Sequence, residues 1–201
     1  MALIKGLLAW YRDPVGGMKT LIPFQYNPAE ITRTFRFEPA PGAAGDAREA
    51  PKAPFEDYSM TLELDATDAL ERAAPLTTAM GISPQLAALE MLMQPVTALE
   101  LAIPFGGSSA PVPRSELPLV LFVWGPERVT PVRVTSLSIT ETAFDEFLHP
   151  IQAQVKLGFT VLRSDDVHDD PIAREAATYY ETARTVKAMH QLAQSVEQLT
   201  P

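Results

Sequence analysis

The sequence predicts a mainly β domain, built on an antiparallel sheet and followed by a long C-terminal helix. Three β-rich segments between residues 117 and 163 carry the prediction of the sheet. The third segment alternates between apolar and polar residues, and this period of two is typical of a strand with one face in a core. Because only short connections join the three segments, we expect them to pair antiparallel.

The composition limits the classes of function. With 201 residues the chain is long enough for one good-sized core, and its ordinary apolar content argues against general disorder. A formal net charge of -9 and the lack of a basic run argue against a nucleic-acid partner, which requires clustered Lys and Arg. The absence of cysteine excludes disulfides, thiolate metal sites and a cysteine nucleophile.

The sequence also predicts where the protein is made. Residues 1–13 lack a basic n-region and a small-residue cleavage site, so we expect no classical export signal. No apolar stretch approaches the roughly 20 residues that span a bilayer. We therefore expect a soluble protein that assembles in the cytoplasm and does not insert into a membrane.

Residues 1–19 are predicted to form an N-terminal arm. Within it, residues 2–10 have the pattern of a short amphipathic helix or of a segment that docks on a neighbour. An ordered terminus that covers its own core is an equal alternative.

The β domain is predicted to span residues 20–164 and to begin with a strand at 20–25. A turn follows at Asn27-Pro28, because the residue before a proline avoids the helical region. Residues 31–37 alternate again, and Arg33 on their apolar side indicates an edge strand or a subunit contact.

A long Ala-, Pro- and Gly-rich loop is expected at residues 38–54, and either mobility or ordering against a neighbouring subunit would explain its composition. A strand follows at 58–64, and a short helical piece capped by Asp65 to Asp68 comes before Pro75. We expect a further strand at 96–103 and a loop at 104–116.

One short internal helix is predicted from Ser83-Pro84 to about Met93, since Ser and Pro are favoured at an N-cap and in a first turn. Leu86, Leu89 and Met93 are expected to be buried. Met91 and Leu92 are further candidates for burial.

Residues 165–201 are predicted to form an acidic turn and a helical extension. The helix begins at Pro171, is capped by Asp170 and runs to about Leu199. Its length indicates that part of it leaves the β domain and contacts another chain. A stripe at heptad-like spacing suits packing on a sheet or on a partner helix, and it comprises Ile172, Ala176, Tyr179, Ala183, Val186, His190 and Ala193.

The sequence predicts neither a catalytic site nor a bound cofactor. His149 is expected to be an exposed turn residue, and His190 a packing residue. His168 lies among four aspartates, the one cluster that resembles the oxygen-rich ligand set of a divalent cation. Helix capping explains these acids without a metal, so we predict no metal site.

Four motifs follow one another along the β domain. The first is Phe24-Gln25-Tyr26-Asn27-Pro28, and the second is a strand that ends in Asp65-Ala66-Thr67. The third is an apolar strand that begins at Pro118 and ends in Trp124-Gly125. The fourth begins at Phe144 or Phe147 and continues through His149-Pro150-Ile151-Gln152-Ala153. In order and spacing, across roughly residues 20–163, these motifs resemble those of the tube and baseplate-adaptor proteins of contractile injection systems, which are phage-tail-like particles.

The sequence also departs from this family. Gln152 stands where the family has an arginine, and the family's glycine in the fourth motif is replaced as well. Many adaptor members carry a LysM peptidoglycan-binding module after this domain, whereas here the Asp-rich turn and the C-terminal helix follow.

The resemblance implies a β-barrel or sandwich of the phage tail-tube type, which assembles as a hexameric ring around a lumen. It implies a non-enzymatic component that connects the inner tube to the baseplate hub or spike, in a particle that is released or docked to a membrane. The residues that could line the lumen are Gln152, Gln154, Lys156 and Thr160. The loop at 38–54 and the C-terminal helix would then be inter-subunit elements. The alternative is a soluble antiparallel β-barrel that binds a ligand, or a small enzyme whose site the sequence does not reveal.

Overall fold

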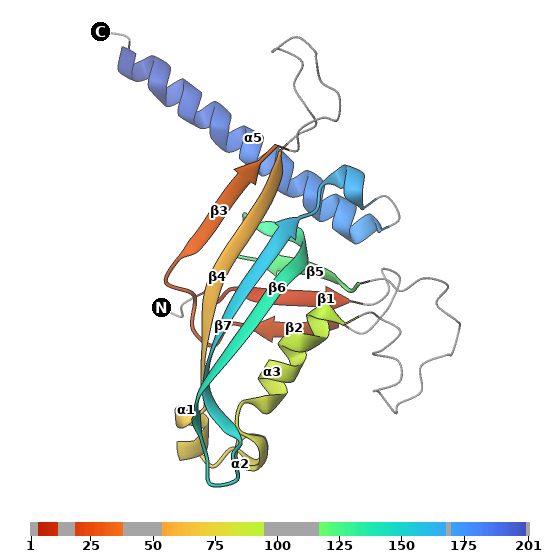
Figure 1. Cartoon of the computed structure of the whole chain (residues 1–201). Coiled ribbons are helices and arrows are strands. Elements are labelled where there is room, and N and C mark those ends of the chain that lie inside the picture. Colours follow the sequence, from red (N-terminus) through yellow and green to blue (C-terminus); the bar gives the residue numbers. More distant parts are fainter. Residues whose placement is uncertain (1–3, 12–18, 38–53, 95–116, 168–169, 200–201) are drawn as a thin grey trace, which may run out of the picture.

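The computed structural model describes residues 4–11, 19–37, 54–94, 117–167 and 170–199. Within these ranges, seven strands form one antiparallel sheet in the order β2-β1-β5-β6-β7-β4-β3. In Figure 1 the long strands β4, β7 and β6 run side by side, and the short strands β5, β1 and β2 cross them at a large angle. The strands are β1 (Leu7–Tyr11), β2 (Lys19–Pro23), β3 (Ile31–Arg36), β4 (Phe55–Asp65), β5 (Leu119–Val123), β6 (Val129–Phe144) and β7 (Pro150–Val161).

The predicted antiparallel sheet is confirmed, and its core lies where the alternation places it. In β7 the apolar side chains of the alternating series from Ala153 to Val161 are buried, and those of β4 from Tyr58 to Leu64 pack in the same cluster. Phe122 of β5 is fully buried, with its ring centroid 5.3 Å from that of Phe159 and 5.6 Å from that of Tyr58. Both halves of the curled sheet therefore share one apolar core.

The expectation of an N-terminal helix or arm is wrong for residues 7–11. They form β1, which pairs with β2 on one side and β5 on the other. Leu8 and Trp10 are buried in the core, so the sheet begins before residue 20. The periodicity of a short apolar run does not distinguish a helix from a strand. Here the pairing with β5 favours the strand.

Strand β3 forms one edge of the sheet, as Arg33 predicts. Its other side has no strand partner among the described residues. The expected loop at 38–54 lies outside the described residues except for Pro54. The expected strand at 96–103 and the loop at 104–116 also lie outside them.

Short helices cover one end of the sheet, and the chain then returns to β5. The predicted internal helix is present, with Leu86, Leu89 and Leu92 buried. The predicted burial of Met93 is wrong, because the last turn is a tighter 3-10 helix that changes the direction of its side chain. The helical elements here are α1 (Thr67–Glu71), α2 (Pro75–Met80), α3 (Ser83–Glu90), the 3-10 helices η1 (Met91–Met93) and η2 (Ser164–Asp166), and α5 (Pro171–Leu199). None of the helices in the described part of the chain is long and apolar enough to cross a membrane.

Helix α5 begins as predicted, because the backbone N–H of Ala173 donates to the Asp170 carboxylate at 2.9 Å. The predicted stripe, however, does not pack on the sheet, and its alternative role of packing on a partner helix stays a prediction. The residues that pack on the domain are Ala173, Ala177 and Tyr180, whereas Val186 is exposed. Ala177 and Val186 are nine residues apart, which at about 100° per residue places them on opposite sides of the helix.

The other large or polar residues of the predicted stripe follow the same geometry. Tyr179 and His190 are exposed, so His190 does not pack on its own domain. Small alanine side chains bring the helix close to the sheet, and the larger apolar residues point outward. The pattern of large hydrophobic residues therefore identifies the outer face of α5.

Substitution of Gly81 tests how the short helices are fixed to the β6–β7 connection. Gly81 has a φ of 59°, an added Cβ would collide with the carbonyl oxygen of Pro150, and the next N–H, that of Ile82, donates to the same oxygen. We expect Gly81→Ala to lower the free energy of unfolding by about 3 kcal/mol, through backbone strain and the displaced contact. Gly125→Ala is the matched control, because Gly125 also has a positive φ, 74°, but opens to free space; about 1 kcal/mol is expected there. Equal losses of unfolding free energy in the two variants, measured by urea denaturation, would contradict this account.

Candidate functional site

The strands β4, β7 and β6 present a polar face to solvent, opposite the core. Gln154 and Lys156 of β7 are exposed on it, and Gln152 and Thr160 are half-buried. The four residues that sequence analysis assigned to a channel lining therefore follow one another along one face of β7. Lys156 lies between Thr61 of β4 and Ser138 of β6, so the face continues across the neighbouring strands.

This polar face consists mainly of hydroxyl and amide side chains. One pair of charges is joined within the sheet, since Asp57 accepts a hydrogen bond from Thr160 and forms an ion pair with Arg36 at 2.8 Å. Such a surface is well hydrated. It also includes Ser59, Glu63, Arg133, Ser136, Thr140 and Thr142.

At one end of the polar face, residues from three of the sequence motifs meet. The side-chain amide of Gln25 pairs with the backbone of Asp65, donating to its carbonyl oxygen and accepting from its N–H at 2.9 Å. The Asp65 carboxylate accepts from the N–H of Thr67 at 2.7 Å and from its hydroxyl. Its other oxygen accepts from the amide of Gln152 at 2.9 Å. Four residues from three distant parts of the chain, Gln25, Asp65, Thr67 and Gln152, thus form one hydrogen-bonded cluster.

Asn27 fixes the segment that precedes β1. Its side-chain oxygen accepts from the N–H of Gly6 and its side-chain N–H donates to the carbonyl of Ile4, each at 2.9 Å. The first motif therefore holds the N-terminal segment against the end of the sheet. Pro28, the next residue, is half-buried.

The aromatic motif residues lie in and beside the core. Phe24 is buried, with its ring centroid 6.4 Å from both Phe122 and Trp124. Trp124 is half-buried, and Gly125 adopts its positive φ in the turn to β6. These residues stabilise the domain and offer no group for chemistry.

The remaining motif positions separate into two groups. Tyr26, Asp65, Gln152, Ala153 and Gln154 are among the residues that line an open groove of about 320 Å³ at the end of the polar face. By contrast, Phe147 lies in the β6–β7 turn, where it is exposed, and Pro150 is buried at the start of β7. The structure thus brings together parts of the first, second and fourth motifs and leaves Phe147 apart.

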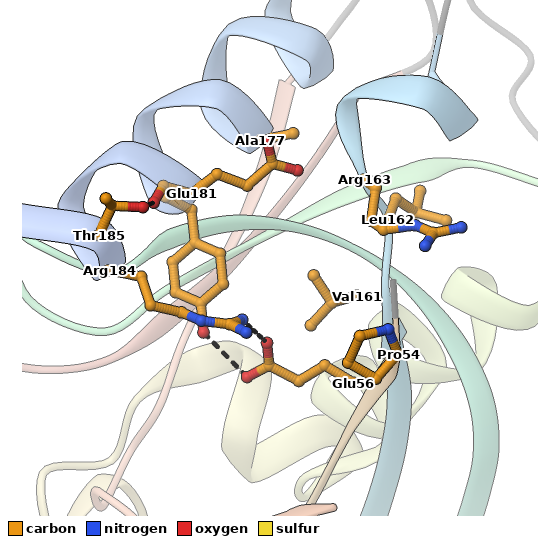
Figure 2. Close-up of a pocket in the computed structure, with 10 residues that line it drawn as sticks. Pro54, Glu56, Val161, Leu162, Arg163, Ala177, Glu181, Arg184 and Thr185 are labelled. Atoms are coloured by element: carbon orange, nitrogen blue, oxygen red, sulfur yellow. Dashed lines mark hydrogen bonds and ion pairs between the residues drawn. The ribbon is translucent and has the colours of Figure 1, made fainter. Parts of the chain in front are cut away.

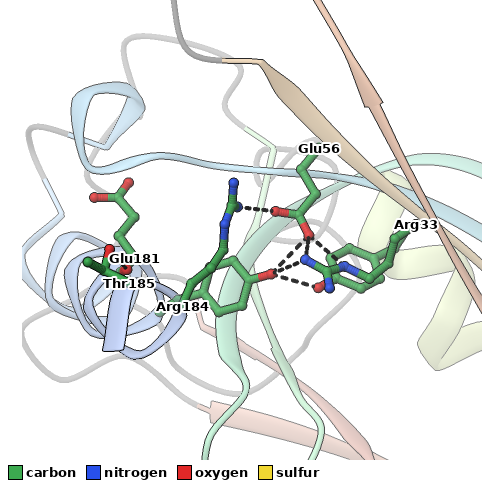
Figure 3. A network of polar contacts seen from close by, with 7 residues as sticks. Arg33, Glu56, Glu181, Arg184 and Thr185 are labelled. Carbon is green, nitrogen blue, oxygen red and sulfur yellow. Dashed lines mark hydrogen bonds and ion pairs between the residues drawn. The ribbon is translucent and has the colours of Figure 1, made fainter. Parts of the chain in front are cut away.

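A second cluster, which sequence analysis missed, surrounds Glu56. This carboxylate is 4% exposed. One of its oxygens accepts from Arg33 of β3 and from the Tyr180 hydroxyl of α5, and the other accepts from Arg184 of α5 at 3.0 Å. The Tyr180 hydroxyl also lies 2.9 Å from that of Tyr58. Figure 3 shows Arg33 and Arg184 approaching Glu56 from opposite sides; we call these five residues the Glu56 clamp.

The electrostatics of the Glu56 clamp follow from burial. Burial and the hydrogen bond to Tyr180 raise the pKa of Tyr58 well above its ordinary value, so its hydroxyl keeps its proton. Burial alone would lower the pKa of Arg33, but the hydrogen bond to Glu56 and the nearby negative groups outweigh it and raise this pKa. The clamp therefore consists of stable ion pairs and hydrogen bonds.

A pocket of about 230 Å³ lies beside the Glu56 clamp, between α5 and the end of β7 (Figure 2). Its wall includes Val161, Leu162 and Ala177, and its polar side includes Glu56 and Arg184. Both oxygens of Glu56 are engaged by the clamp, and Figure 2 shows Arg184 turned toward this carboxylate. The arrangement fastens α5 to the sheet.

The histidines do not assemble into a site in the described part of the chain. His149 is half-buried rather than freely exposed, and its ring forms an ion-pair contact with Asp145 at 2.9 Å. His168 lies outside the described residues. Within the ranges given above, no group of three or more His, Cys, Asp or Glu side chains is placed to hold a metal ion.

Comparisons with known proteins find no family model that matches the chain and no matching curated protein. A function is therefore inferred from the motifs of this sequence and from the surfaces just described.

The Asp65 cluster predicts a measurable pKa change. Hydrogen bonds from the Thr67 side chain and backbone, with a smaller contribution from Gln152, hold the pKa of Asp65 below its ordinary value of 3.8. We expect Thr67→Val to raise this pKa, as followed by carboxyl-carbon NMR, and Gln152→Ala to raise it less. Because the folded-state pKa is depressed, the carboxylate stabilises the fold above its unfolded-state pKa, and this contribution is lost as the pH falls through the folded-state value. A Thr67→Val protein with an unchanged Asp65 pKa would contradict the assignment.

The Glu56 clamp predicts a selective loss of stability. We expect Glu56→Gln to lower the free energy of unfolding by about 2 kcal/mol; this is less than for a fully buried ion pair because both arginines are partly exposed. The matched control is Glu127→Gln, which removes the exposed ion pair between Glu127 and Lys187. Lys187 lies on α5, as Tyr180 and Arg184 of the clamp do. Urea denaturation should not distinguish this control from the wild type. A Glu56→Gln protein as stable as the control would show that the clamp does not stabilise the fold.

Proposed function

We propose that this protein is a structural ring component of a contractile injection system, which connects the inner tube to the baseplate hub or spike. The observation that carries the proposal is the meeting of three family-like motifs in one cluster. Gln25 and Gln152 each bond to Asp65, so segments of the first, second and fourth motifs meet at the end of the polar face, although Gln152 stands where the family has an arginine.

The polar face supports a channel lining. A passage for cargo must stay hydrated and must bind its contents weakly, which suits a face of mainly hydroxyl and amide side chains. Gln154 and Lys156 project from the centre of this face, with Thr61 and Ser138 on the strands beside Lys156. In a ring, this face of each subunit would turn toward the axis.

The sheet also offers surfaces for assembly. Among the described residues, strand β3 has no strand partner on its outer side, and Phe35 and the following Phe37 are 47% and 62% exposed; such an edge is a ready site for another chain. The long helix α5 extends past the strands in Figure 1. A tail-tube-type barrel, completed by neighbouring subunits in a hexamer, accounts for both features.

In this proposal the protein acts by shape and not by catalysis, without a cofactor. Its partners are further copies of itself, the inner tube, the hub or spike and neighbouring baseplate proteins. Assembly takes place in the cytoplasm, and the finished particle is released or docked to a membrane.

Electron microscopy tests the proposal directly. We expect the purified protein, alone or mixed with tube and hub proteins, to form six-fold rings or to join tube ends in negative stain and light scattering. Because the chain has no cysteine, Gln154→Cys gives a single thiol, and a maleimide gold cluster on it should lie on the ring axis. Asp165→Cys, on an exposed residue of η2, is the control and should place gold off the axis. A monomer that ignores these partners would refute the proposal, and gold from Gln154→Cys at the periphery would refute the lining.

A further inference from the structure

Large apolar side chains are exposed at one end of the molecule, where α2 meets the β6–β7 turn. Met80 ends α2, and the following Gly81 lies against Pro150 and His149 at the end of the turn. Leu148 is 78% exposed, the largest value for a big apolar side chain in the described part of the chain. We define the tip surface as Phe144, Phe147 and Leu148 at the turn with Leu76 and Met80 of α2.

The backbone at this end of the molecule is held in strained conformations. Ala73, between α1 and α2, and Leu148 have φ values of 49° and 66°, and they are the only non-glycine residues with a positive φ in the described ranges. Each costs free energy, because a side chain in the left-handed region crowds its own backbone. The Asp145 carboxylate fixes the turn by accepting hydrogen bonds from the N–H groups of Phe147 and His149, at 2.9 and 2.8 Å. Such strain gathers where a conformation is used, and at the turn it presents Phe147 and Leu148 to solvent.

The charges around the tip surface are mainly negative. Four exposed carboxylates surround it, two from α1, which lies beside the same turn in Figure 1, and two from the strand and turn themselves. In the described part of the chain, none of the four forms an ion pair or a side-chain hydrogen bond. Within residues 65–82 and 141–150, Arg72 is the one lysine or arginine. The four carboxylates are those of Asp68, Glu71, Glu141 and Glu146.

An apolar surface with a negative border fits a partner that offers apolar side chains beside lysine or arginine. An amphipathic helix presents both groups at once, as an apolar stripe with cations along its borders. A membrane fits less well, because the four carboxylates would repel anionic headgroups. The distal part of α5 in a second copy does not supply the cations, since Arg184 and Lys187 are engaged by Glu56 and Glu127. We propose that the tip surface binds a basic amphipathic helix of a different protein.

This inference deepens the proposed function, and it rests on that function only for the natural partner, which would be a neighbouring baseplate protein. The recognition itself depends on the tip surface and on the charges at its border. It can therefore be measured without any other particle component.

A model peptide tests the recognition. The probe is a short, fluorescein-labelled helix of leucine and lysine with all leucines on one face, followed by fluorescence anisotropy at physiological salt. We expect Phe147→Ser to weaken binding at least about tenfold, because it removes an aromatic contact, and Glu146→Gln about threefold, because it removes one exposed charge pair. The matched controls are Met189→Ser, at a residue of α5 that is 62% exposed, and Glu175→Gln, which removes an exposed charge near the start of α5. Both controls should bind the peptide like the wild type.

The Leu148→Gly variant separates recognition from folding. Glycine relieves the strain at a positive φ, so we expect this variant to unfold at a higher urea concentration than the wild type. It should also bind the peptide at least about fivefold more weakly, because it lacks the exposed leucine side chain. A leucine that served only to stabilise the turn would give the opposite change in stability. Circular dichroism checks that all variants fold, as expected for exposed positions.

Other results would overturn the inference in distinct ways. Equal affinities of Glu146→Gln and Glu175→Gln would mean that the peptide responds to net charge alone. Loss of binding in Met189→Ser instead of Phe147→Ser would place the peptide on α5. Absence of binding up to about 1 mM peptide would refute the inference, as would cosedimentation of the wild type, but not of Phe147→Ser, with phosphatidylcholine vesicles. Rings that form without peptide binding would leave the proposed function standing, whereas peptide binding by a protein that forms no rings would leave this inference standing.

Discussion

The buried carboxylate of Glu56 is the constraint on which the placement of the C-terminal helix depends. A carboxylate that is 4% exposed is costly unless cations and hydrogen-bond donors compensate for the lost water. Arg33 comes from the edge strand, and Tyr180 and Arg184 come from α5. One charge in β4 thus fixes both the edge of the sheet and the helix that crosses it.

The Glu56 clamp also determines which side of α5 faces solvent. Tyr180 and Arg184 are one helical turn apart, so binding both to Glu56 sets the rotation of the helix about its axis. Ala173 and Ala177 then meet the domain on the same side, where their small size allows close contact. The larger apolar residues Val186 and Met189 are left outside. Apolar residues that would be expected in a core are therefore presented to solvent.

Local patterns predicted much of the sheet and of α5. The alternation of β7 predicted its buried series, Asp170 predicted the start of α5, and Arg33 on the apolar side of β3 predicted an edge strand. These features depend on residues that are neighbours in the sequence, so the sequence alone can predict them. The convergence of Gln25 and Asp65, and the continuity of the polar face across β4, β7 and β6, depend on strand order, which local patterns do not predict.

Where the sequence interpretation failed, long-range contacts overrode a local pattern. Residues 7–11 become a strand because β5 and β2 flank them. The stripe on α5 faces outward because Glu56, 128 residues from Arg184, holds the opposite side. One signal could have located the clamp: Glu56 alternates with the core residues of β4 and so lies on the apolar side, as Arg33 does in β3. A charge on the buried face of each of two paired strands predicts an ion pair, because neither could be buried alone.

The distribution of polar and apolar surface connects the fold with the proposed assembly. The broad face of the long strands is polar, whereas exposed large apolar residues gather at the β6–β7 turn and on the distal part of α5. Hydrophobic association is therefore favoured at the two ends and disfavoured across the face. The charged and hydroxyl side chains of this face disfavour the stacking of two sheets face to face, because stacking would bury polar groups without partners. In the proposed ring, the same face would therefore be free to border a hydrated channel.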